Sequence, residues 1–173
     1  VAVHTYADQI NVCSAYRTSD GANSAVLLAQ AASAAPEAVI VYRHELLTNN
    51  DFKSGLLGWE AGGPVEVLAR QHAVRVTEKL HVHQLVPVTP GAAYRLLIRA
   101  RCLQPDTFTR LQVNWVDKSG RGLPPYLLPV SCTSQWADYS SVITAPANAA
   151  SGYFYVTGHT EKPVLIQHAS MAW

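Results

Sequence analysis

Short runs of alternating hydrophobic and polar residues, separated by Gly, Pro and Asn, fill the chain from residue 64 onward. The clearest runs lie at residues 65–79, 81–88, 94–102, 110–116, 127–132, 139–144, 153–157 and 164–170. Side chains two residues apart point to the same face of a β-strand, so each run predicts a strand with one buried face. Many short strands broken by turn residues are typical of an antiparallel sandwich. The pattern therefore predicts an all-β fold.

The same alternation separates the expected core side chains from the outward ones. The predicted core set consists of Tyr94, Leu96, Ile98, Ala100, Leu111, Val113 and Trp115. The opposite faces carry Arg95, Leu97, Arg99, Arg101, Arg110, Gln112 and Asn114. Tyr153 and Tyr155 alternate with apolar neighbours and are expected on the polar side.

Two stretches carry turn signals. Thr89-Pro90-Gly91 lies between two strand-like runs, and because Pro fixes φ while Gly permits positive φ, it predicts a hairpin there. Upstream, ELLTNNDFKSGLLGWEAGG spans residues 45–63 and contains an Asn-Asn-Asp turn. The large rings of Phe52 and Trp59 follow that turn, and we expect the loop to fold back and insert both into the core.

The first 44 residues read differently from the rest of the chain. SAVLLAQAASAA, at 24–35, is a helix candidate with Ser24 as N-cap and Pro36 as its stop, and a strand is the alternative. AVIVY, at 38–42, predicts a buried strand. Since 44 residues are too few for a core of their own, we expect this extension to dock on the sandwich or on a partner.

Composition narrows the function classes. The 173 residues fit one domain with an extension, and 14% charged residues with a net charge of +1 give no electrostatic argument for nucleic acid. No apolar run is long enough to span a bilayer. No signal peptide is recognisable, and Val1 as the first residue is expected of a processed or excised chain.

The three cysteines leave two interpretations open. Cys102 and Cys132 stand near the ends of predicted strands, so one bridge with Cys13 left over is possible. Three small buried hydrophobic residues are the alternative. Their spacing matches no zinc pattern.

The stretch at 45–63 resembles the opening of the family 4/9 type carbohydrate-binding modules, roughly Leu-Leu-x-Asn-Gly-x-Phe-Glu-x-Gly-x-x-x-Trp. The resemblance continues in order through HQLVPVTPGAAYRLLIRARC, LQVNWVDKSGRG, a Trp followed by SVITAPANA, and VLIQHASM. It covers residues 45–173 and implies a galactose-binding-like jelly-roll β-sandwich that binds glycan across the concave face of one sheet. It also implies a secreted, periplasmic or cell-surface location.

Sugar recognition needs aromatic rings for the apolar faces of a pyranose, together with planar donors and acceptors for its hydroxyls. The predicted ligand residues are therefore His83, Arg99, Arg110, Gln112, Asn114 and Tyr155. The alternative interpretation is a solvated sheet face that binds nothing. The tryptophans Trp59, Trp115 and Trp136 match core positions of the pattern instead. Tyr126, in a proline-rich stretch, is expected either to line a cleft or to pack locally.

No cofactor is expected. Modules of the resembled type hold a structural calcium partly through a glutamate after the Phe of the opening motif, where this chain has Lys53, and an ammonium repels a cation. One hypothesis is that the Lys53 ammonium takes the place of the ion. His81 and His83 share a strand face, but no third metal ligand is identifiable and we expect ordinary sheet histidines.

No catalytic motif is recognisable, so the sequence favours a binding protein over an enzyme. The first hypothesis is non-catalytic glycan binding, as a module or subunit of a larger extracytoplasmic assembly. The alternative is a structural β-sandwich that has lost sugar binding and docks on a protein or membrane-protein complex. A glycan hydrolase has only fold analogy behind it.

Overall fold

The computed structural model describes residues 15–17, 23–25 and 44–173, and it divides the chain into two compact units, 1–41 and 42–173. In the first unit, β1 (Ala15–Arg17) pairs antiparallel with β2 (Asn23–Ala25). Ser24 thus lies within a strand and does not cap a helix that starts there. The rest of the predicted helix, the predicted strand at 38–42 and Cys13 lie outside the described residues.

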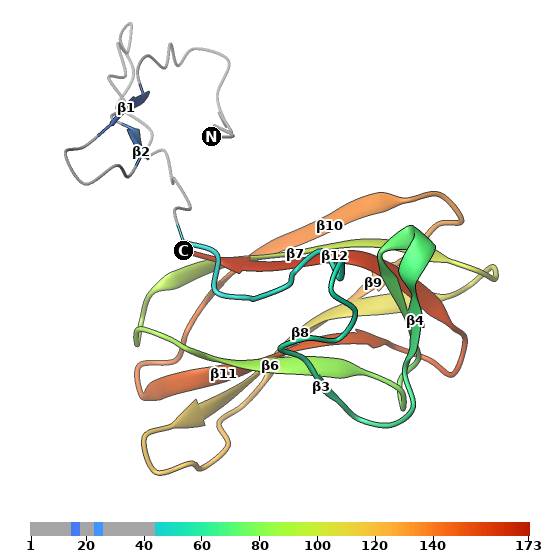
Figure 1. Ribbon diagram of the computed structural model, residues 1–173. Coiled ribbons are helices and arrows are strands. Elements are labelled where there is room, and N and C mark those ends of the chain that lie inside the picture. Colours follow the sequence, from blue (N-terminus) through green and yellow to red (C-terminus); the bar gives the residue numbers. More distant parts are fainter. Residues whose placement is uncertain (1–14, 18–22, 26–43) are drawn as a thin grey trace, which may run out of the picture. The chain divides into compact units, whose positions relative to one another are not determined.

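The second unit is a sandwich of two five-stranded antiparallel sheets (Figure 1). The β7 sheet has the order β10 (Ala137–Thr144), β7 (Ala93–Cys102), β12 (Val164–Ala172), β5 (Ala73–Val76) and β4 (Glu66–Leu68). The β11 sheet has the order β3 (Glu60–Ala61), β6 (Val82–Pro87), β11 (Ala149–Gly158), β8 (Phe108–Asp117) and β9 (Tyr126–Ser131). A short 3₁₀ turn, Ala69–Gln71, separates β4 from β5. The all-β jelly-roll prediction is confirmed.

The core lies between the two sheets, where the alternation placed it. Leu96, Ile98 and Ala100 of β7 and Leu111 and Val113 of β8 are fully buried. The residues between them on β7 are partly exposed on the outer side of the sheet. Alternation with a period of two thus identified the buried face of both long strands correctly.

The loop at 49–59 closes the sandwich as predicted. The rings of Phe52 and Trp59 are buried and lie 5.1 Å apart, and the Trp59 indole N–H donates to the Asn49 carbonyl at 3.1 Å. Asn49 adopts φ 46°, which Asn tolerates better than most residues. Its side-chain amide donates to the carbonyls of Gly55 and Leu57 and so holds the loop from within.

The tryptophan predictions hold for two residues of three. Trp59 and Trp115 are buried core residues. Trp136 is only half-buried at the outer surface of the β7 sheet, where the Arg101 guanidinium lies 5.0 Å from its ring centroid. Tyr126 packs against the core, and its hydroxyl lies 2.8 Å from the Ser141 hydroxyl, which links β9 to β10.

The predicted hairpin at residues 89–91 is wrong. The turn itself forms, since the Ala92 N–H donates to the Thr89 carbonyl at 3.1 Å and Gly91 has φ 73°. However, β6 before it pairs with β3 and β11, whereas β7 after it pairs with β10 and β12. The turn therefore carries the chain from one sheet to the other, because turn residues set the local bend but not the strand partners.

A disulfide joins Cys102, at the end of β7, to Cys132, directly after β9. The two Cα atoms lie 5.5 Å apart and the residues are 30 apart in sequence. The bridge thus fixes the end of one sheet to an edge of the other, and of the two interpretations left open for these cysteines, the bridged one is correct. In the part of the chain that the structure describes, no helix is long and apolar enough to cross a membrane.

Candidate functional site

The outer face of the β11 sheet carries a row of side chains from all five strands. In the strand register, Glu60 faces His83, His83 faces Tyr155, Tyr155 faces Gln112 and Gln112 faces Leu127. His83, Tyr155 and Gln112 alternate with buried residues along the three central strands, so the row lies on the side away from the core. We call these residues, with His81, Tyr153, Arg110 and Asn114 beside them, the β11 face.

Aromatic rings form the centre of the β11 face. The imidazole of His83 stacks on the ring of Tyr155, with centroids 4.9 Å apart and planes at 23°. His81 lies 5.2 Å from Tyr155, and Tyr153 meets His83 edge-on at 5.4 Å. Four rings from two adjacent strands and the loop before β6 therefore make a continuous aromatic surface on an open sheet.

Amides lie beside the rings on β8. The Gln112 side chain donates from Nε2 to Asn114 Oδ1 at 3.0 Å, and Asn114 stands opposite Tyr153 in the register. Gln112 is only 8% exposed although it is on the outer side. Its Oε1 is buried and accepts no hydrogen bond. A planar acceptor is thus held in place beside Tyr155 without a partner among the described residues.

Three buried polar atoms without a partner belong to this one face: Gln112 Oε1, His83 Nδ1 and Arg110 Nε. A buried polar atom with no hydrogen bond costs about 1–3 kcal/mol, so such atoms are uncommon in folded proteins. Gln112 and His83 flank Tyr155 in the same row, and Arg110 lies two residues before Gln112 on β8. A ligand with several hydroxyls over this row would supply the missing donors and acceptors.

The electrostatics of the face come from few groups. Glu60, well exposed, places Oε2 3.3 Å from His83 Nε2. Burial, helped by the nearby positive groups of His83 and Arg110, lowers the pKa of His81 below its usual value and favours the neutral ring. None of the described acidic side chains forms an ion pair with Arg110.

Five of the six predicted ligand residues meet on the β11 face: His83, Arg110, Gln112, Asn114 and Tyr155. The sixth, Arg99, lies on the outer side of the β7 sheet, where its guanidinium pairs with Asp138 at 3.2 Å. The prediction also left out neighbours that the structure adds. The alternation along the strands could have identified Tyr153 and His81, since each is two residues from a predicted ligand residue on the same strand face. No sequence feature indicated Glu60.

The residues at the expected calcium position do not fit that ion. Lys53 stands where the resembled modules have an acidic ligand, and its ammonium pairs with Asp51 at 2.5 Å on the surface. The Asp51 carboxylate also accepts the backbone N–H of Lys53. Across the described ranges, no group of three or more His, Cys, Asp or Glu side chains is placed to hold a metal ion.

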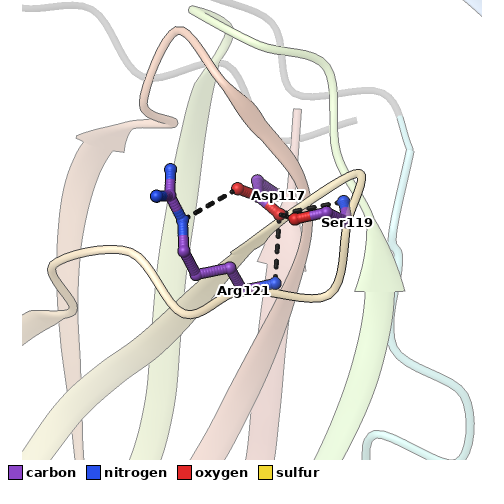
Figure 2. A network of polar contacts seen from close by, with 3 residues as sticks. All are labelled: Asp117, Ser119 and Arg121. Carbon is purple, nitrogen blue, oxygen red and sulfur yellow. Dashed lines mark hydrogen bonds and ion pairs between the residues drawn. The ribbon is translucent and has the colours of Figure 1, made fainter.

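An open hollow of about 460 Å³ lies at one end of the sandwich, between Pro90, the turn at 117–119 and residues 147–149. Its lining includes no aromatic ring, and its one carboxylate is already engaged (Figure 2). The Asp117 carboxylate accepts from the Ser119 hydroxyl at 2.6 Å and from the Arg121 backbone N–H at 3.0 Å. We therefore assign this network to the turn after β8 and the candidate site to the β11 face.

Several solved structures share this fold. A family 16 carbohydrate-binding module aligns with a TM-score of 0.57 at 17% identity, over 73% of this chain and 98% of its own. A xylan-binding domain of family 22 aligns with a TM-score of 0.55 at 19% identity, over 76% and 94%. At these identities the likeness shows the fold alone. The sandwich of this chain has the fold that carbohydrate-binding modules also have.

This chain also aligns with part of a longer enzyme chain. A Clostridium thermocellum xylanase 10B fragment, comprising CBM22-1 and GH10 modules in complex with xylohexaose, aligns with a TM-score of 0.54 at 12% identity. The match covers 74% of this chain but only 28% of that one. No protein-family model and no curated protein sequence matches this chain.

Proposed function

We propose that the sandwich binds carbohydrate without catalysis, through the β11 face. The observation that carries the proposal is the row on which Gln112 Oε1 and His83 Nδ1, both buried and unpartnered, stand on either side of the Tyr155 ring. A pyranose offers an apolar C–H face to a ring and hydroxyls to the polar atoms beside it. The row has the chemistry for both contacts at once.

The mechanism is recognition by a pre-formed surface. Gln112 is held by Asn114, and His83 by Glu60 and by stacking on Tyr155, so these side chains lose little freedom when a ligand arrives. The face is open, so water competes for each hydroxyl and affinity is expected in the micromolar to millimolar range usual for weak binding, about −4 to −8 kcal/mol. The module would serve by holding its parent assembly near a glycan.

The location outside the cytoplasm is part of the same proposal. The Cys102–Cys132 disulfide supports it, because such bridges persist in oxidising compartments and are rare in the reducing cytosol. The structural neighbours include a xylan-binding domain and a module in a xylanase complexed with xylohexaose, which supports a glycan as the ligand class.

A protein partner is the second candidate, and one observation favours it. Leu85 and Leu127 are 51% and 49% exposed and stand on the β11 face next to Tyr153 and Gln112. Exposed apolar side chains grouped on one face are typical of docking surfaces. In that case the leucines would carry the binding and the unpartnered amide would contribute little.

The test is a screen of the folded chain on a glycan array and on affinity gels, beside the Gln112→Ala, Asn114→Ala double variant. The matched control is Gln167→Ala, which removes an amide on the outer side of the β7 sheet. We expect retention of the wild type and the control on at least one glycan, and loss in the double variant. Leu85→Ser, Leu127→Ser is a third variant, with retention expected to survive in part.

Each outcome decides between the two candidates. Equal retention of the wild type and the double variant would move the sugar site away from the β11 face. No retention of any folded protein on any glycan would overturn the proposal and favour the docking role. Circular dichroism of every variant shows whether the sandwich is intact.

A further inference from the structure

The β11 face carries one guanidinium and one carboxylate among the residues that the structure describes. Its charged or titratable residues among those the structure describes are Arg110 from β8, His81 and His83 at β6, and Glu60 from β3, besides the tyrosines. Glu60 is close to His83 and lies at the β3 edge of the sheet. Arg110 therefore holds a permanent positive charge on the far side of the aromatic surface, with no described acid paired to it.

Three of the seven arginines in residues 44–173 have a carboxylate partner in the described structure, and Arg110 is the arginine that stands on the β11 face. Arg75 pairs with Glu66 at 3.2 Å, Arg99 with Asp138 at 3.2 Å and Arg121 with Asp117 at 3.3 Å. Arg75, Arg101 and Arg110 each have a buried Nε without a hydrogen-bond acceptor. Arg75 pairs with Glu66, and Arg101 donates to Gln71 through another nitrogen, whereas Arg110 has no such partner among the described residues. Among the described residues, the Arg110 guanidinium therefore has neither a carboxylate partner nor an acceptor for its Nε.

The distance along the strand matches the size of one sugar. Arg110 and Gln112 project on the same side of β8, two residues apart, which corresponds to about 6.6–6.8 Å. A pyranose over Tyr155 that donates a hydroxyl to Gln112 would thus bring its exocyclic carbon close to Arg110. A carboxylate at that carbon offers two coplanar oxygens, which is the arrangement that a guanidinium pairs with best.

We infer, on the basis of the proposed function, that the β11 face takes a glycan containing uronic acid and that Arg110 pairs with the carboxylate of the sugar stacked on Tyr155. Burial first, and then the charges of His83 and Arg110, lower the pKa of His81, and an anion beside Arg110 would oppose only the smaller, electrostatic part. Neutral glycans have no carboxylate to pair with the Arg110 guanidinium.

The test compares each acidic glycan with its own neutral form. Polygalacturonic acid, alginate and glucuronoxylan are immobilised beside their carboxyl-reduced counterparts, and binding is measured by affinity gel and calorimetry at low and at near-physiological salt. We expect the wild type to prefer one acidic glycan over its reduced form by about tenfold or more, as for a charge-assisted hydrogen-bonded pair. Arg110→Gln should bring the two affinities together, and Arg110→Lys should restore part of the preference.

The control is Arg95→Gln. Arg95 also has no described acidic partner, but it lies on the outer side of the β7 sheet, away from the aromatic row. Its loss should leave the preference intact. If Arg95→Gln abolishes the preference and Arg110→Gln does not, the anion site is on the other sheet and the inference is wrong.

The remaining outcomes separate this inference from the function on which it rests. Equal binding of acidic and reduced glycans by the wild type overturns the uronate inference and leaves glycan binding in place. Absence of binding to all six polymers by folded protein overturns the uronate inference, and the wider glycan array then decides whether the proposed function also fails. Preference for a sulfated glycan on that array, with none for a carboxylated one, would likewise reject the uronate.

Discussion

The outer faces of the two sheets look alike in sequence and differ in how their polar groups are used. On the β7 sheet, Arg75 and Arg99 have carboxylate partners, and Arg101 donates to Gln71 and lies over the Trp136 ring. On the β11 face the amide, imidazole and guanidinium groups each leave a buried atom without a partner. Arg75 Nε and Arg101 Nε on the β7 sheet are also buried without a partner, so the two faces differ chiefly in the row of aromatic rings that only the β11 face places beside such atoms.

On the β7 sheet, the outward polar side chains have a structural role. Leu165 points to the outer side of the β7 sheet, between Arg75 and Arg101 in the register, and is only 2% exposed. The arginine side chains beside it cover apolar surface with their aliphatic parts, which is a structural role. Unsatisfied polar atoms on a sheet face therefore indicate binding most strongly where they stand beside a row of aromatic rings, as on the β11 face.

The largest expected effect is on stability, and it follows from removing the disulfide that links the two sheets. Closing a loop of 30 residues with a disulfide stabilises by about 3–4 kcal/mol in the chain-entropy account. Cys102→Ala with Cys132→Ala should lower the free energy of unfolding by about that amount, measured in urea. Glycan retention should persist below the transition, because neither cysteine is on the β11 face. An unchanged urea midpoint would show that the bridge adds nothing.

Removing one aromatic ring from each face tests whether only the rings of the β11 sheet contribute to glycan binding. Tyr155→Ala should weaken glycan binding by about tenfold, or about 1.4 kcal/mol, since the central stacking surface is lost. Trp136→Ala should leave binding unchanged and reduce stability, because Arg101 loses its ring. Calorimetric titration with the best glycan measures the first effect. Equal effects of the two variants on binding would erase the distinction between the faces.

A glutamine-to-methionine exchange on each sheet separates stability from binding. Gln112→Met removes a buried acceptor that has no described partner and also the donor to Asn114, so we expect the free energy of unfolding to rise by less than about 1 kcal/mol while glycan binding falls. Gln167→Met on the β7 sheet removes a donor to the Gln71 carbonyl and should do the reverse, slightly lowering stability without affecting binding. Urea unfolding and affinity gels on the same samples provide both readouts.

The smallest effect concerns the turn after β8, which belongs to the β11 sheet but has its polar groups satisfied. Hydrogen bonds, first from the Ser119 hydroxyl and then from the Arg121 backbone, lower the pKa of Asp117 below its usual 3.8 (Figure 2). The carboxylate thus contributes stability above that value and loses it as pH falls through the folded-state pKa. Asp117→Asn should therefore flatten the decline in thermal stability below about pH 4. An identical decline in both proteins would assign it to other carboxylates.

The sequence predicted the local features well because they depend on neighbours along the chain. Alternation identified the core faces of β7 and β8, and the Asn-rich turn placed Phe52 and Trp59 in the core. Five of the six predicted ligand residues lie on one face for the same reason, since each was judged by its position within its own strand, and their role in binding stays a prediction.

The errors arose where the answer depends on which strands are neighbours. Arg99 has the same local pattern as Arg110, and only the strand order places it on the other sheet beside Asp138. The turn at 89–91 was recognised, but its role as a connection between sheets depends on pairings with β10, β11 and β12, far along the chain. Glu60 was not predicted because its strand, β3, has only two residues and is too short to show a periodic pattern.

The position of β12 has a consequence for the order in which this sandwich can fold. It is the last of the strands that the structure describes, yet it lies between β7 and β5 in the middle of its sheet (Figure 1). Its residue Ala172 pairs with Glu45 at the start of the sandwich. During synthesis, β5 and β7 must wait with unpaired edges until residues 164–172 have left the ribosome. Folding is therefore expected in milliseconds to seconds after that point, as for other sandwiches rich in distant pairings, and chaperone binding is expected before it.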